Sequence, residues 1–107
     1  MDVYAAIAEP NRRRMLSMLA ARELPVGALA AEFDITFQAV SQHLGVLYEA
    51  GLVTRRRQGR ERLYTANPEP LREVHEWTGQ YQRFWNDRID RLNAMLIKRR
   101  RKKTRAS

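Results

Sequence analysis

The segment from Pro25 to Ala50 limits the possible folds of this chain more than any other part. Apolar residues recur at three- and four-residue spacing as far as Phe33, and the same spacing resumes after Asp34-Ile35-Thr36. This pattern predicts two short helices joined by a tight turn. Thr36 is a suitable N-cap for the second helix, because its hydroxyl can accept a backbone N–H of the first turn.

The second helix of this segment has an outer face of unusual chemistry. Its buried stripe is predicted to contain Val40, Leu44, Leu47 and Tyr48. The residues off that stripe are mostly uncharged and able to form hydrogen bonds, with one aromatic ring: Phe37, Gln38, Ser41, Gln42 and Gly45. Glutamine can pair with adenine, and apolar atoms can contact the thymine methyl. The face therefore suits the edges of DNA bases, although an ordinary amphipathic helix with a polar outer side would look similar.

The formal net charge of +8 is concentrated at one end of the chain. Residues 98–105 contain 7 basic residues, which leaves 13 basic and 12 acidic residues in 1–97. We expect residues 98–107 to be a disordered basic tail that samples phosphate or acidic surfaces. A simple solvated terminus is an equally good interpretation of this run.

Composition excludes several other classes. The chain has no cysteine, which removes disulfides and thiolate metal sites and fits a cytoplasmic location. No apolar run is long enough to span a membrane, and the N-terminus does not resemble a secretory signal. At 107 residues the chain forms one domain, small enough for oligomerisation to help it bury apolar surface.

Two helices are predicted before the central segment. A short first helix contains Val3, Tyr4 and Ile7, and Pro10 can open the second because a first-turn residue needs no intrahelical N–H partner. The second helix buries a stripe that includes Met15 and Leu19. Its more exposed positions are Arg12, Arg13 and Ser17, and residues 22–25 form a connector.

A β-hairpin is predicted directly after the central segment. Gly51 can end the preceding helix in a left-handed conformation, and two β-prone runs follow on either side of Gln58-Gly59. The hairpin base is apolar, whereas its tip carries arginines on both strands. Such a tip could reach a phosphate backbone or the minor groove. The arginines could also serve only to protect an exposed sheet edge.

The chain is predicted to be helical from Leu71 to about Arg99, with a kink or split at Gly79. This segment contains both tryptophans and a wide apolar stripe. We expect the stripe to pack against the same helix of a second subunit, although it could instead pack back on its own domain. Together with the first helix, the predicted dimer interface comprises Val3, Ile7, Tyr81, Phe84, Trp85, Ile89, Leu92, Met95 and Leu96.

The order of these motifs resembles the ArsR-type winged helix-turn-helix repressors. The resemblance is carried by AEPNRRRMLSML (8–19), VGALAAEF (26–33), AVSQHLGVLYEAGLV (39–53) and RRQGRERLY (56–64). The last helical segment is similar to the metal-independent, autorepressor-like branch of that family. The resemblance implies a mainly α fold with a small β-hairpin wing, about five helices and a long C-terminal dimerisation helix in residues 1–97. It also implies a homodimer that binds double-stranded DNA at a palindromic operator and represses transcription.

The resemblance further implies which residues contact DNA. Thr36 begins the recognition helix, and the family's contacts fall on Phe37, Gln38, Ser41, Gln42, Arg57, Gln58, Gly59 and Arg60. Phe37 and Gln38 depart from the Ser-Gln-Pro common at this position, so we expect a different operator. The two interpretations of Phe37 are contact with a thymine methyl and local packing. Pro25 replaces the usual capping serine at the start of the helix before the recognition helix. That helix therefore lacks a side-chain cap.

We expect no metal, no cofactor and no catalytic activity. The family's thiolate motif falls on residues 23–29, which read ELPVGAL, and His75, Glu76, Asp87 and Asp90 do not have the spacing of its second metal site. The five glycines form no phosphate-binding loop, and no nucleophile has an evident base. The alternative function is a non-specific nucleic-acid-binding or protein-interaction module that uses the basic tail and the aromatic helix. The sequence does not identify the operator, the regulated genes or an effector.

Overall fold

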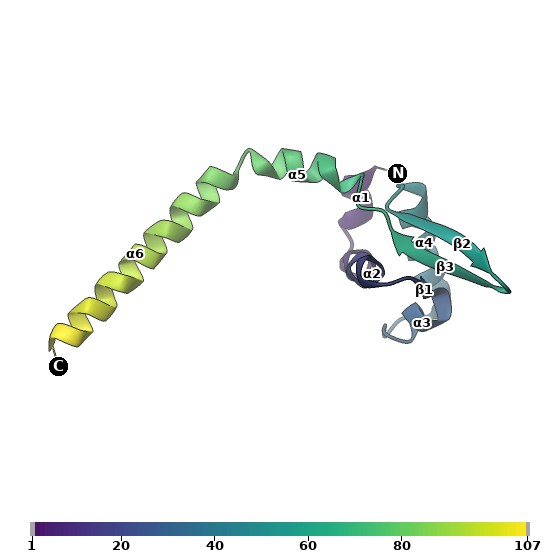
Figure 1. Ribbon diagram of the computed structural model, residues 1–107, viewed down its shortest axis with the longest axis horizontal. Coiled ribbons are helices and arrows are strands. Elements are labelled where there is room, and N and C mark those ends of the chain that lie inside the picture. The colour runs from purple at the N-terminus through teal and green to yellow at the C-terminus, as the bar shows by residue number, and fades with distance from the viewer. Residues whose placement is uncertain (1, 107) are drawn as a thin grey trace. The chain divides into compact units, whose positions relative to one another are not determined.

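The computed structural model describes residues 2–106, with side chains described for residues 2–99. The chain divides into two compact units, residues 1–74 and 75–107. In the described residues there are six helices and one three-stranded sheet (Figure 1). The count exceeds the five expected helices because the terminal helix divides.

Four helices form most of the first unit: α1 (Val3–Ile7), α2 (Pro10–Ala21), α3 (Val26–Ala30) and α4 (Phe37–Glu49). Side chains cap three of them. Asp2 Oδ1 accepts from Ala5 N at 2.7 Å, Glu9 accepts from Arg12 N at 2.9 Å, and Thr36 Oγ1 accepts from Ala39 N at 3.1 Å. Pro25 precedes α3 and provides no side-chain cap. The predicted helix-turn-helix and its Thr36 cap are therefore confirmed.

The sheet contains β1 (Leu24–Pro25), β2 (Val53–Gln58) and β3 (Glu61–Ala66), in the order β1-β3-β2. The predicted hairpin is present, but its two-residue loop is Gly59-Arg60 rather than Gln58-Gly59, because Gln58 pairs with Glu61. Gly59 has a φ of 64°, as the first loop residue of a type II′ turn requires. Strand β1 lies in the expected connector, where Leu24 pairs with Tyr64 of β3.

The core of the first unit contains residues from α1 to β3. Its members are Val3, Ala6, Met15, Leu16, Leu19, Leu24, Leu29, Val40, Leu44, Leu47, Leu52, Val53 and Tyr64. One expectation is wrong here. Tyr48, assigned to the buried stripe of α4, is 42% exposed, because its position lies at the edge of that stripe. Val3, one of the predicted interface residues, is 6% exposed because it packs in the core of its own chain.

The predicted split near Gly79 is confirmed, since α5 (Leu71–Gly79) ends there and α6 (Gln82–Ala106) follows. Leu71 and Val74, at the start of α5, pack against the core of the first unit. Helix α6 continues through most of the segment 98–107 that was expected to be disordered, and Ser107 lies outside the described residues. Lysine and arginine are good helix formers, and this segment has no glycine or proline to end the helix. No helix among the described residues is long and apolar enough to cross a membrane.

Candidate nucleic-acid interface

The outer face of α4 presents the residues that the sequence assigned to it. Phe37, Gln38, Ser41, Gln42 and Gly45 are all exposed, and none of them belongs to the core. The ring of Phe37 is 59% exposed, so it does not pack locally. At 100° per residue, these positions form one continuous surface on the side opposite Val40, Leu44 and Leu47. The helix therefore offers amide and hydroxyl groups and one ring to an external partner.

Gly45 lies near the centre of this surface. A Cβ atom built at this position would meet no atom within 4 Å, so the fold itself does not require glycine here. Beside it lies an open hollow of about 440 Å³, lined by Arg12, Gln42, His43, Gly45, Val46 and Glu49. The outer face of α4 thus has a shallow centre, where no side chain projects.

The strands of the wing (β2, β3 and the loop between them) place alternate arginines on opposite faces. Arg55 and Arg57 share one face with the buried residue Val53, and across the strands Arg57 lies opposite Arg62. The Arg55 guanidinium lies 3.9 Å from the centre of the Tyr48 ring of α4. This face of the wing is therefore the one beside α4, and we call Arg55, Arg57 and Arg62 the inner arginines.

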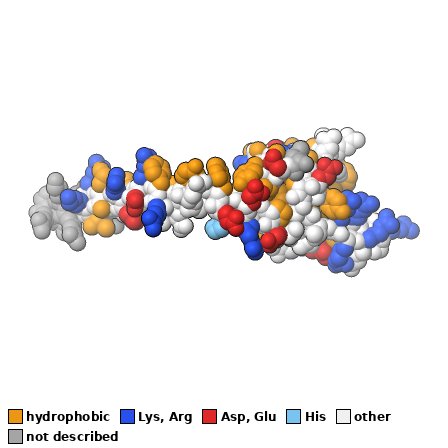
Figure 2. Space-filling model, turned by 90° about the horizontal axis from the view of Figure 1, so that it is seen from above, with side chains coloured by type: hydrophobic (Ala, Val, Ile, Leu, Met, Phe, Trp, Pro, Cys, Tyr) orange, Lys and Arg blue, Asp and Glu red, His pale blue; other side chains and the backbone are white. Residues whose placement is uncertain are grey.

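The inner arginines line an open hollow of about 320 Å³ together with Arg56. Like charges that lie directly opposite each other on neighbouring strands are destabilising, so the Arg57–Arg62 pair costs the isolated wing some stability. Figure 2 shows Lys and Arg side chains gathered at the end of the molecule that the wing forms. A bound anion would offset this repulsion.

Arg56 has a structural role on the opposite face. Its Nη2 lies 2.6 Å from Glu23 Oε1 and its Nε lies 2.9 Å from Glu23 Oε2, while Thr65 donates to the same carboxylate at 3.2 Å. The hydrogen bonds from Arg56 hold the pKa of Glu23 below its ordinary value, and the same pairing raises the pKa of Arg56. This ion pair ties the wing to the residue preceding β1.

The four predicted wing residues are not equivalent. All four are exposed, but Gln58 points to the face opposite the inner arginines and accepts a hydrogen bond from Arg56 at 3.2 Å. Gly59 forms the turn. Among the described residues, the side chains of Arg57, Arg60 and Arg62 make no hydrogen bond or ion pair. The prediction omitted Arg55 and Arg62, which strand alternation from the buried Val53 and the correct hairpin register would have identified.

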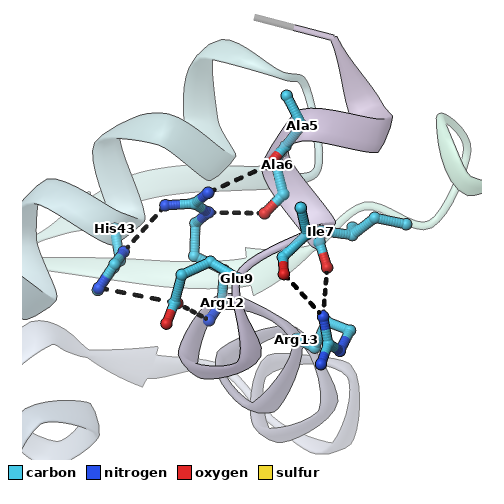
Figure 3. A network of polar contacts seen from close by, with 8 residues as sticks. Ala5, Ala6, Ile7, Glu9, Arg12, Arg13 and His43 are labelled. Carbon is cyan, nitrogen blue, oxygen red and sulfur yellow. Dashed lines mark hydrogen bonds and ion pairs between the residues drawn. The ribbon is translucent and has the colours of Figure 1, made fainter.

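A polar junction connects the start of α2 to α1 and α4 (Figure 3). Arg12, expected to be exposed, is half-buried and donates to the carbonyls of Ala5 and Ala6 at 3.1 and 2.6 Å, and its Nη1 lies 3.2 Å from His43 Nδ1. The carboxylate of Glu9 lies 3.8 Å from His43 Nε2. Burial raises the pKa of Glu9, but hydrogen bonds from the backbone of Arg12 and Asn11, with the nearby charges, lower it overall. Arg12 thus contacts α1 and α4 rather than solvent alone.

In the second unit, seven predicted interface residues have exposed side chains. Tyr81, Phe84, Trp85, Ile89, Leu92, Met95 and Leu96 are between 45% and 57% exposed. Figure 2 shows hydrophobic side chains along α6. Within the described part of the chain, no three His, Cys, Asp or Glu side chains are grouped so that they could hold a metal ion. The exposed face of α4 is thus polar and the wing is cationic, whereas α6 exposes a row of large apolar side chains among its charged ones.

Helices α3 and α4 form a helix-turn-helix, and the hairpin of β2 and β3 follows it as a wing. This combination defines the winged helix-turn-helix, a class of DNA-binding domain. Residues 7–56 match a family model described as a helix-turn-helix domain. The transcriptional repressor SdpR of Bacillus subtilis (strain 168) is 30% identical over 76 residues, which cover 71% of this chain and 84% of that protein.

Solved structures agree with this class. A possible transcriptional regulator for arsenical resistance is 44% identical, with a TM-score of 0.67 over 88% of this chain and 95% of that chain. An ArsR family transcriptional regulator is 30% identical, with a TM-score of 0.67 over 78% of this chain and 86% of that chain. The chain belongs to the ArsR-type family of winged helix-turn-helix proteins, and it is a sequence-specific DNA-binding transcriptional regulator.

Proposed function

We propose that the protein is a homodimeric repressor that binds a palindromic operator in the cytoplasm and responds to no thiolate-bound metal. The observation that carries this proposal is the pairing of two surfaces in the first unit. The outer face of α4 offers uncharged groups suited to bases, and the wing beside it carries arginines with no internal partner. Repression follows if the occupied operator overlaps a promoter.

In this proposal α4 enters the major groove. Gln38 and Gln42 are the residues most suited to adenine, Ser41 can donate or accept, and the Phe37 ring can contact a thymine methyl. Thr36 caps the helix, so the remaining N–H groups and the positive end of its dipole favour a nearby phosphate. The two recognition helices of the dimer would lie about one DNA turn apart, roughly 34 Å, in successive grooves.

The wing supplies affinity that does not depend on sequence. Arg57 and Arg60, with the inner arginine Arg62, would contact the flanking phosphates or the minor groove. Gln58 and Gly59 would contribute through the turn that presents these side chains. Arg56 stays paired with Glu23 and supports the wing rather than binding DNA.

The dimer would form through α6, and the sequence also assigns Ile7 of α1 to the interface. A row of half-exposed large apolar residues on one helix is a surface that water solvates poorly, and such patches mark protein interfaces. A second copy of the same helix provides a matching apolar surface, as two-fold symmetric interfaces require. Two linked recognition helices then bind two half-sites with greater avidity than one.

The test is selection of DNA from a random duplex pool by the purified full-length protein at several salt concentrations. Recovery of an inverted repeat with half-sites about one helical turn apart would support the proposal. Retention of DNA with no shared motif, lost when residues 98–107 are removed, would overturn it. That second outcome would favour a non-specific nucleic-acid-binding module that acts through the basic end.

A further inference from the structure

Arg12 connects the end of α1 to the recognition helix. Its Nε and Nη2 donate to the last carbonyls of α1, and its Nη1 lies 3.2 Å from Nδ1 of His43 (Figure 3). A guanidinium can only donate, so His43 Nδ1 is the acceptor. This contact therefore requires the tautomer with its hydrogen on Nε2, the nitrogen that faces Glu9 at 3.8 Å.

The charged groups around the His43 ring come from two helices. Arg12 and Glu9 approach it from α2, and Glu49 of α4 lines the same hollow. The His43 side chain is 20% exposed and follows directly after Gln42, one of the residues assigned to base reading. A change at His43 therefore acts on the helix that reads DNA.

We propose that Arg12 and His43 are positioning residues that fix α4 against the end of α1, and that protonation of His43 breaks this link and weakens operator binding. A protonated imidazole has a hydrogen on Nδ1, which would then face the donor and the positive charge of Arg12. Arg12 keeps its bonds to the α1 carbonyls, whereas α4 loses its contact with it. This inference rests on the proposed function, because it takes α4 as the helix that binds the operator.

The sign of the effect separates this mechanism from ordinary electrostatics. Protonation adds a positive charge near DNA, and added charge by itself strengthens attraction to the phosphate backbone. Glu9 also favours the protonated ring. A fall in affinity on acidification therefore requires that the loss of the Arg12 contact outweigh both effects.

The experiment measures operator affinity of the full-length protein at constant salt, from about pH 8 to about pH 5.5. The operator is one selected at about pH 8, and circular dichroism at each pH verifies that the protein stays folded. We expect the affinity of the unaltered protein to fall roughly tenfold over this range. His43→Gln keeps an acceptor oxygen for Arg12 but does not titrate, so its affinity should stay high and change little with pH. Arg12→Ala should bind more weakly at about pH 8 and show little further change.

Two control variants isolate the junction. Arg13 donates to the carbonyls of Ile7 and Ala8, at the same end of α1, but the described contacts of its side chain do not include α4. Arg13→Ala should therefore keep the pH dependence. His75→Gln should keep it too, since His75 is the only other histidine of the chain.

Two results would overturn the inference: an affinity that is constant or rises on acidification, or an equal fall in His43→Gln. Failure to recover any operator at about pH 8 would be a different result. It would reject the proposed function, and this inference with it.

Discussion

The two units of the chain use apolar residues in opposite ways. The first unit buries thirteen hydrophobic residues against one another and presents polar and cationic side chains on α4 and the wing. The described part of α6 buries no residue, and its large apolar side chains are about half exposed. The first unit is therefore stabilised by its own core. The apolar side chains of α6 would be buried only if another surface packed against them. This difference supports the proposal that the first unit binds DNA and that α6 packs against a second copy of the chain.

The largest expected effect comes from placing a charge in the apolar row of α6. Leu92→Glu should abolish the dimer at micromolar concentration and lower operator affinity by a factor on the order of 100 or more, because the avidity of two linked half-sites is lost. Sedimentation and operator titration would measure the two effects. Asp90→Lys, on the other side of the helix, is the matched control, and a dimer that survives Leu92→Glu would contradict the proposed interface.

Removal of one base-reading group should have the next largest effect. Gln42→Ala should cost about 1–3 kcal/mol of binding free energy on the preferred operator and relax preference at one base pair, if the contact is bidentate. Competition with operators altered at single positions would locate that base pair. An equal loss on every DNA tested would mean that Gln42 does not read sequence.

The wing should contribute equally to all sequences. Arg60→Ala and Arg62→Ala should each weaken binding several-fold and reduce the slope of log affinity against log salt by about 1, because each removes one phosphate contact. Arg56→Ala provides a comparison on the opposite face, where Glu23 already occupies the guanidinium. A larger change in slope for Arg56→Ala than for Arg62→Ala would reverse the assignment of the two faces.

We expect the Phe37 ring to contact the methyl group of a thymine in the operator. Replacing thymine by uracil at the contacted position should lower affinity about fourfold, since burial of one carbon contributes roughly 0.8 kcal/mol. The same DNA change should have no effect on Phe37→Ala, whose fold is unaffected because the ring is exposed. Equal sensitivity of both proteins to uracil at every position would show that the ring contacts no methyl group.

The smallest expected effect is on stability and depends on pH. The pKa of Glu23 is lowered in the folded protein by Arg56, so its stabilising contribution is present above the ordinary value of 4.5 and is lost as the pH falls through the lower, folded-state value. Glu23→Gln should therefore be less stable than the unaltered protein at about pH 7, with the gap closing at about pH 3. Denaturant titration at the two pH values would measure this. A gap that widens in acid would contradict the ion pair.

The features that the sequence predicted correctly are local ones. Thr36 is both adjacent to α4 and chemically suited to cap it, and Gly51 has the left-handed φ of 76° expected after a helix. The break near Gly79 follows from the residue itself. Each of these outcomes depends on a few neighbouring residues, so spacing and residue type were sufficient.

The features that the sequence did not predict depend on residues far apart in the chain. Strand β1 exists only because Leu24 pairs with Tyr64, and Arg56 is held in an ion pair only because the fold places Glu23 beside it. The sequence predicts that Arg12 is exposed to solvent. In the folded chain it instead donates to a carbonyl of α1 and contacts His43 of α4. A shift of one residue in the hairpin loop also changes which residues lie directly opposite each other, so Arg57 is paired with Arg62 rather than with Arg60. No periodicity within one element contains this information.

Gly45 leaves room for a new side chain at the centre of the outer face of α4. A side chain added there meets no atom of its own chain within 4 Å, and replacing glycine by alanine inside a helix stabilises it by roughly 0.5–1 kcal/mol. Most recognition residues can be altered only by giving up an existing contact, whereas this position can gain one. If α4 binds DNA as proposed, a library varied at Gly45 alone is therefore a direct route to variants that remain folded yet recognise different DNA.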